Sequence, residues 1–134
     1  MWAHYADSHK GVCLGYDLSM LDLNDIKQKV LFSSMKKVWY SSERYNDSQG
    51  LFTPFIKAQE WSYEQEWRLY NKNRPLFVKF PCLQSVYLGA KFDYESESME
   101  KIVSSIKKCS RDINMYACRP DNKTYKINLI KINN

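Results

Sequence analysis

The sequence predicts an α+β fold in which one domain spans residues 1–134, with a mostly antiparallel sheet, one long amphipathic helix and one or two short helices. Two observations lead to this prediction. Short apolar runs of strand length recur along the chain and are bounded by Gly, Pro, Asn and Asp. One segment in the last third has the three- and four-residue apolar spacing of a helix.

Seven short segments combine apolar residues with flanking turn formers, and we expect each of them to be a strand. They are residues 12–17, 36–43, 64–70, 75–80, 85–90, 113–118 and 124–132. In the second segment, Val38 and Tyr40 fall on one face and Trp39 on the other. In the last segment neither face is polar, so this strand is expected to be central in its sheet or covered on both faces. A turn at residues 120–122 precedes it.

The clearest helix is expected at about residues 94–109, where apolar side chains recur at steps of three and four. Its apolar stripe consists of Met99, Ile102, Val103, Ile106 and Cys109. Acidic residues occupy its first turns and two lysines its last, which is the arrangement that the helix dipole favours. A weaker helix is expected within residues 50–60, beginning near Thr53 and Pro54, because proline is well tolerated in a first helical turn.

Charge, cysteine usage and hydropathy restrict the class of protein. The net charge is +5, and residues 101–134 contain eight Lys or Arg against two Asp. The cysteines are widely spaced, so we expect reduced, mostly buried thiols and no zinc site; they are Cys13, Cys82, Cys109 and Cys118. No apolar run approaches the roughly 20 residues that span a bilayer, and nothing at the N-terminus has the order of a secretory signal. We therefore expect a basic cytoplasmic protein without a membrane segment.

Both histidines lie near the start of the chain, in WAHYADSHKG. His4 beside Tyr5 is a candidate for acid–base chemistry, because histidine has the unperturbed pKa nearest neutrality. The alternative is that His4 packs into the core with the aromatic residues. His9 is expected to form, with Gly11, a turn that leads into the first strand. A metal site is not expected, because the spacing of the two histidines does not place them on one helical face.

A second group of candidates is Glu64, Glu66 and Arg68, which alternate along the expected strand at 64–70 and would share one face. If that face is covered, the carboxylates must pair with Arg68 or shift their pKa upward. A Glu beside another Glu is a candidate general base or an acceptor for a sugar hydroxyl. The alternative is a structural ion pair with Arg68.

A third candidate is the C-terminal pair of strands, where basic residues interleave with Tyr116 and Tyr125. The basic residues are Arg119, Lys123, Lys126 and Lys131. Aromatic stacking next to cations is a common way to hold single-stranded nucleic acid. The alternative is a solvated basic face, since no known RNA-binding motif is present.

Four segments resemble the bacterial domain of unknown function 2971 family. They are MWAHYADSHKGVCLGYD at 1–17, KKVWY at 36–40, WSYEQEWR at 61–68 and SVYLGA at 85–90. Members share, in this order, M-W-x-H-Y-A-x-x-H-x-G, V-x-Y, W-x-x-E-x-E-x-R and V-x-L-G. The resemblance implies that the chain is the C-terminal part of the usual domain, without its N-terminal segment. A strand edge left open near residues 12–17 would then favour a homo-oligomer or a partner chain that completes the sheet.

The resemblance marks positions of interest without assigning roles to them, and two functions are considered. The first is an enzyme with a cleft formed by His4, Tyr5, Glu66 and Arg68. Its expected binding residues are Trp2, His9, Tyr40 and Glu64. This order of His, strand Tyr and Glu is similar to ADP-ribosyltransferase-like folds, which implies NAD as the dinucleotide that is bound; no other cofactor is evident. The second is a non-enzymatic binding module for nucleic acid or a protein partner, which uses the C-terminal strands.

Overall fold

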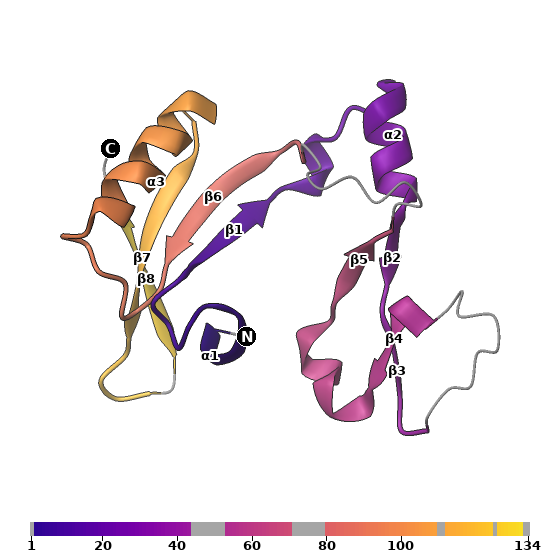
Figure 1. The fold of residues 1–134 in the computed structure, drawn as a ribbon, viewed down its shortest axis with the longest axis horizontal. Coiled ribbons are helices and arrows are strands. Elements are labelled where there is room, and N and C mark those ends of the chain that lie inside the picture. Colours follow the sequence, from indigo (N-terminus) through magenta and orange to yellow (C-terminus); the bar gives the residue numbers. More distant parts are fainter. Residues whose placement is uncertain (1, 44–52, 71–79, 110–111, 125, 133–134) are drawn as a thin grey trace. The chain divides into compact units, whose positions relative to one another are not determined.

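The computed structural model describes residues 2–43, 53–70, 80–109, 112–124 and 126–132 (Figure 1). The chain divides into two compact units, which are residues 1–20 with 80–134 and residues 21–79. Helices and strands both occur, and three of the five strand pairings are antiparallel in the part of the chain that the structure describes. The predicted α+β class is therefore confirmed, whereas one domain over residues 1–134 stays a prediction.

The first unit is built on a four-stranded sheet with the order β1-β6-β7-β8. The strands are β1 (Val12–Tyr16), β6 (Leu83–Leu88), β7 (Asn114–Pro120) and β8 (Ile127–Ile132). The two outer strands run antiparallel to their neighbours, and β6 is parallel to β7. A parallel pair needs a crossover connection, and α3 (Glu97–Cys109) lies in that connection. Four of the predicted strands are thus confirmed with shifted ends.

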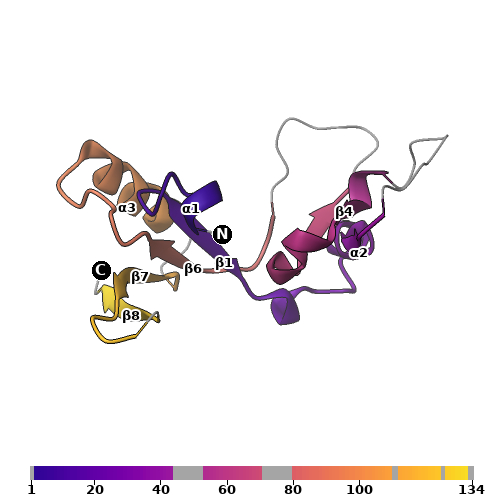
Figure 2. The same ribbon diagram turned by 90° about the horizontal axis from the view of Figure 1, so that it is seen from below.

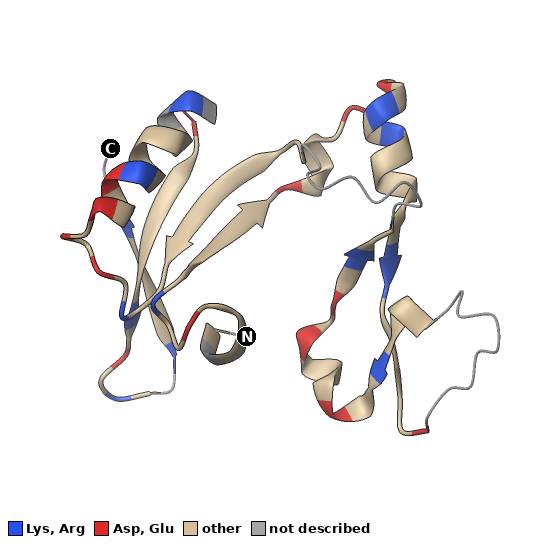
Figure 3. Cartoon of the chain, in the orientation of Figure 1, with Lys and Arg blue, Asp and Glu red and all other residues tan. Residues whose placement is uncertain are grey.

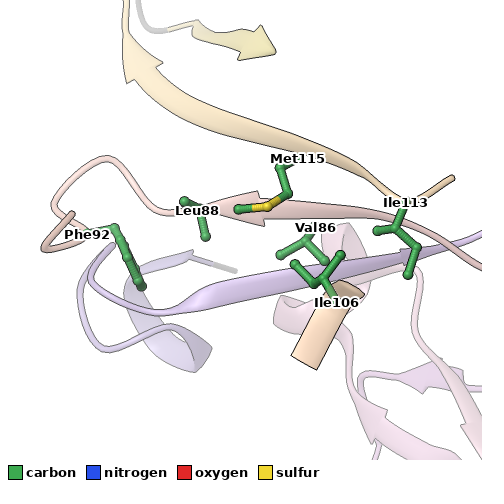
Figure 4. Packing of buried hydrophobic residues seen from close by; sticks show 6 residues of the cluster. All are labelled: Val86, Leu88, Phe92, Ile106, Ile113 and Met115. Carbon is green, nitrogen blue, oxygen red and sulfur yellow. The ribbon is translucent and has the colours of Figure 1, made fainter. Parts of the chain in front are cut away.

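The helix α3 covers one face of this sheet, as Figure 2 shows from below. Its residues Met99, Ile102 and Val103 pack against a cluster of buried side chains, shown in Figure 4: Val86, Leu88, Phe92, Ile106, Ile113 and Met115. The predicted helix is confirmed, but it begins at Glu97 because a turn precedes it. In that turn the Asp93 carboxylate accepts from the Glu95 amide at 3.1 Å, and the Ser96 hydroxyl donates to the Asp93 carbonyl at 2.8 Å.

The start of the chain forms a short helix and a turn rather than an extended strand entry. The helix α1 (Trp2–Tyr5) is followed by three residues with positive φ, Asp7, Ser8 and His9. The Gly11 amide then donates to the Ala6 carbonyl at 2.8 Å, which closes the turn ahead of β1. The predicted turn at His9 to Gly11 is therefore confirmed.

This turn lies directly against the end of β6. The Lys91 amide donates to the His9 carbonyl at 2.9 Å, and the Gly89 amide donates to the Gly11 carbonyl at 3.0 Å. A Cβ atom at Gly89 would lie 2.0 Å from the His9 carbonyl oxygen. Residue 89 must therefore be glycine for the turn to approach the strand this closely.

Two predictions about the first sheet are wrong. β8 is at the edge of the sheet, and its apolar residues on both faces are exposed, including Leu129 at 53% and Ile130 at 54%. It is therefore neither central nor covered. Of the described cysteines only Cys118 is buried, whereas Cys82 is half-buried and Cys13 is exposed, so the prediction of mostly buried thiols is wrong for them. The expectation that another chain completes the sheet stays a prediction.

The described residues of the second unit form two small sheets and one longer helix. β2 (Met35–Lys37) pairs antiparallel with β5 (Trp67–Leu69), and β3 (Trp39–Ser41) pairs parallel with β4 (Ile56–Ala58). The helix α2 (Ile26–Ser33) is capped by Asp25, whose carboxylate accepts from the Lys27 amide at 2.7 Å. The 3₁₀ helices are η1 (Leu18–Met20) in the first unit and η2 (Thr53–Phe55) and η3 (Gln59–Glu64) in the second.

The second unit corrects several predictions. The predicted strand at 36–43 is divided at Val38 into β2 and β3. Val38 is 3% exposed and its neighbour Trp39 is 66% exposed, so the two side chains point in opposite directions as predicted. The predicted helix at 50–60 is wrong for its described residues, because a single 3₁₀ turn leads there into β4. Most of the predicted strand at 75–80 lies outside the described residues. No helix in the described part is long and apolar enough to cross a bilayer.

Candidate functional site

Four charged side chains of the second unit form one connected network of ion pairs. The Nζ atom of Lys57 lies 2.5 Å from Oε2 of Glu64 and 3.3 Å from Oε2 of Glu66. The Arg68 guanidinium binds Glu66 through both carboxylate oxygens, with Nε 2.6 Å from Oε1 and Nη2 3.0 Å from Oε2. The side chain of Glu64 is 4% exposed and that of Lys57 is 17% exposed. Glu64, Glu66 and Arg68 thus meet as predicted, but they do so around a lysine.

The local backbone explains how the network forms. Glu66 directly precedes β5 and Arg68 is its central residue, and the predicted ion pair between them is confirmed. Glu64 ends η3, and Gln65, with a φ of 46°, separates it from Glu66. The prediction that all three residues alternate along one strand is therefore wrong, because only Arg68 is in β5. The ammonium group of Lys57, on β4, binds the carboxylates of both Glu64 and Glu66 and so connects Glu64 to the pair of Glu66 and Arg68.

The backbone of Glu66 is held on both sides. Its amide donates to the Tyr40 hydroxyl at 2.8 Å, and its carbonyl accepts from the Val38 amide at 2.9 Å. The Arg68 guanidinium also donates to the carbonyl of Pro54. Tyr40 therefore positions Glu66 through its main chain, and this contact differs from the ligand-binding role expected for it.

The charge state of Glu66 follows from its partners. The hydrogen bond from Arg68 holds the pKa of the Glu66 carboxyl below its usual value, and Lys57 adds to this effect, whereas partial burial opposes it. Glu66 is therefore ionised at neutral pH and is a poor general acid or base, since such a group needs a pKa near the working pH. An ionised carboxylate can accept hydrogen bonds from substrate hydroxyls and can stabilise a nearby positive charge.

A pocket of about 390 Å³ borders the network at Lys57. Its lining supplies three hydroxyls and two further carboxylates, from Ser41, Ser42, Thr53, Glu43 and Glu60. Lys57 also lies over the Trp61 ring, with Nζ 4.8 Å from the ring centroid. Among the described residues of the lining, Glu43 and Glu60 are acids that do not belong to the network. The hydroxyls and carboxylates of the lining can form hydrogen bonds with the hydroxyls of a ligand.

The candidates at the start of the chain belong to the first unit. His4 and Tyr5 are on α1 and both are exposed, so the alternative in which His4 packs into the core is wrong. The rings of Trp2 and His9 stack with their centroids 6.3 Å apart. Nδ1 of His9 is buried and has no hydrogen-bond partner among the described residues. A cleft that joins His4 and Tyr5 to Glu66 and Arg68 stays a prediction.

The predicted basic and Tyr-rich surface is only partly brought together. Tyr116 and Lys131 are register partners on β7 and β8 and share one face. Arg119 instead belongs to the helix side of the sheet, where its guanidinium lies 5.0 Å from the Tyr94 ring centroid. Tyr125 is outside the described residues. No group of three His, Cys, Asp or Glu side chains suited to a metal ion occurs in the described ranges.

Lys57 is the important residue that sequence analysis missed. A signal for it was present, because two carboxylates and one arginine on a covered surface need a further cation. The expected helix at 50–60 concealed it, since that assignment placed Lys57 on a helix and not on a strand beside residues 64–68.

Comparisons with known proteins identify the family. A family model described as "Protein of unknown function (DUF2971)" matches residues 1–69, which is just over half of the 134 residues. The match includes the His4, Tyr40 and Glu66 motifs, while the V-x-L-G motif at 86–89 lies beyond it. No curated protein and no solved structure matches the chain. The chain belongs to this family of proteins of unknown function.

Proposed function

We propose that the protein is an enzyme that acts on a hydroxylated small molecule, and that the substrate contains a ribosyl or related glycosyl group. One observation carries this proposal: Lys57 belongs both to a partly buried network of four charges and to the lining of a pocket that also contains three hydroxyls and two carboxylates. Holding such charges away from water is costly, and paired charges beside a pocket are frequent at functional sites.

The ionised state of Glu66 selects the chemistry. When a glycosyl group is transferred, positive charge develops at its ring, and a fixed carboxylate stabilises that charge without changing its own protonation state. The same carboxylate accepts a hydrogen bond from a ribose hydroxyl. Glu66 is suited to this role because Arg68 and Lys57 fix both of its oxygens.

NAD is the substrate that we propose to test first, on the basis of the similarity to ADP-ribosyltransferase-like folds. In the proposed step the bond between ribose and nicotinamide breaks, and nicotinamide leaves with the electron pair. The ribosyl carbon is then captured by water or by an acceptor hydroxyl, which loses its proton.

The test measures nicotinamide release from NAD by the wild-type chain and by Glu66→Gln, which preserves the shape of the side chain and removes its charge. Glu97→Gln, on the exposed surface of α3, is the matched control. We expect the Glu66 variant to lose roughly 100-fold in kcat, the usual effect of removing one electrostatic group from an active site, and the control to retain full activity. Equal turnover in wild type and Glu66→Gln, or none in either, would refute the proposal.

A further inference from the structure

We propose that the sheet face opposite α3 binds single-stranded nucleic acid, through a row of side chains that crosses all four strands of the first unit. The register aligns Cys13 of β1 with Tyr87 of β6, Tyr87 with Tyr116 of β7, and Tyr116 with Lys131 of β8. The two outer residues of this row are exposed and the two tyrosines are half-buried. This inference is independent of the pocket in the second unit.

The two tyrosines form a fixed aromatic platform. Their ring centroids are 5.3 Å apart and their planes differ by 16°, so the rings are stacked. The hydroxyls of Ser85 and Tyr87 are hydrogen-bonded at 3.1 Å. Gly15 provides the space for one ring, because a Cβ atom there would lie 3.0 Å from Cε2 of Tyr87. A preorganised aromatic surface of this kind can stack bases at a low entropic cost.

Charge complementarity indicates a polyanion as the occupant. Lys131 of β8 lies on this face beside Tyr116, and the described part of the connection between β7 and β8 contains Lys123 and Lys126 against a single acid, Asp121. Four of the eight acids of this unit, Asp93, Glu95, Glu97 and Glu100, lie around the start of α3, which packs on the other face (Figure 3). Lys131 lies next to Tyr116, so a base stacked on the ring would place its phosphate close to an ammonium group.

The combination of rings and cations favours single strands over other polyanions. An open sheet with stacked aromatic side chains can receive unstacked bases, whereas duplex DNA keeps its bases stacked inside and offers only phosphates to such a surface. An acidic peptide would use the lysines but would gain little from the tyrosine pair. Dependence on the aromatic rings therefore distinguishes the proposed ligand.

The test is a fluorescence anisotropy titration of the full chain with a labelled oligothymidylate of about 16 nucleotides, which covers the site sizes of single-strand binding modules. Tyr116→Leu and Tyr87→Leu remove the rings but keep apolar volume. Each should weaken binding by about 5-fold or more, because stacking of one base on an aromatic ring contributes roughly 1–3 kcal/mol. Circular dichroism verifies that these variants are folded.

A charge variant keeps the test decisive if a tyrosine variant fails to fold. Lys131→Gln should reduce the slope of log K against log salt by about 0.7, the value for one lost phosphate contact on a single strand. Lys108→Gln, on α3, is the matched control and should leave the slope unchanged. The proposal is overturned if wild type does not bind at low salt or if Lys131→Gln has the wild-type slope. It also fails if a duplex or a polyglutamate peptide binds as tightly as the single strand.

Discussion

Replacing Lys57 by methionine removes the cation that lies between Glu64 and Glu66 and keeps most of the apolar stem. We expect this change to lower the free energy of unfolding of the second unit by roughly 3–4 kcal/mol. The reason is that Glu64, at 4% side-chain exposure, would be left as a buried charge without the ammonium group 2.5 Å away.

The magnitude follows from the surroundings of each partner. Removing one member of a buried ion pair typically costs about 3–5 kcal/mol, most of it from the charge that remains. The lower end of this range applies here, because the Lys57 side chain is 17% exposed and Glu66 still has its ion pair with Arg68 in the variant. Loss of the contact between Nζ and the Trp61 ring adds about 0.5–1 kcal/mol.

The assay is urea unfolding followed by tryptophan fluorescence for variants of the second unit, and by circular dichroism for a control variant on α3 of the first unit. Three of the four tryptophans, Trp39, Trp61 and Trp67, belong to the second unit, so fluorescence reports mainly on it. Lys101→Met is the matched control. Its ion pair with Glu97 has a similar distance of 3.0 Å, but the side chains are 75% and 86% exposed, so the expected loss is below about 0.5 kcal/mol.

A second variant separates a buried charge from a packing defect. Combining Lys57→Met with Glu64→Gln also removes the buried carboxylate that has lost its ammonium group, so the double variant should be more stable than Lys57→Met alone. The reasoning is refuted if Lys57→Met costs no more than Lys101→Met, or if the double variant recovers no stability.

Two further predictions concern pH and the turn before β1. Because folding lowers the pKa of Glu66, its contribution to stability is complete above the ordinary value of about 4.3 and is lost as the pH falls through the folded value. Urea unfolding between neutral and acidic pH should show this decline, and Glu66→Gln should make it shallower; parallel curves would contradict the assignment. Gly89→Ala places a Cβ atom 2.0 Å from the His9 carbonyl oxygen and should lower the free energy of unfolding of the first unit by about 1–3 kcal/mol. Thermal unfolding should then show a lower Tm. An unchanged Tm would show that the turn does not approach residue 89 so closely.

Local patterns in the sequence were sufficient for several elements. The spacing of Met99, Ile102, Val103 and Ile106 predicted both α3 and the face that it buries, because helical periodicity depends only on neighbouring residues. The turn at His9 was predicted for the same reason, since Gly11 and the residues before it limit the local backbone. The resemblance in the His4 and Glu66 motifs also agreed with the family match.

Other features depend on residues that are distant in the sequence, and only the tertiary structure decided them. The apolar pattern of residues 127–132 is that of a covered strand, yet β8 is at the edge because sheet order depends on which strands pair. Glu64 and Glu66 could be recognised as charges needing partners, but Lys57 was found only once β4 was in place. Periodicity records which side of an element is apolar, whereas the contacts that compensate a buried charge are made between elements.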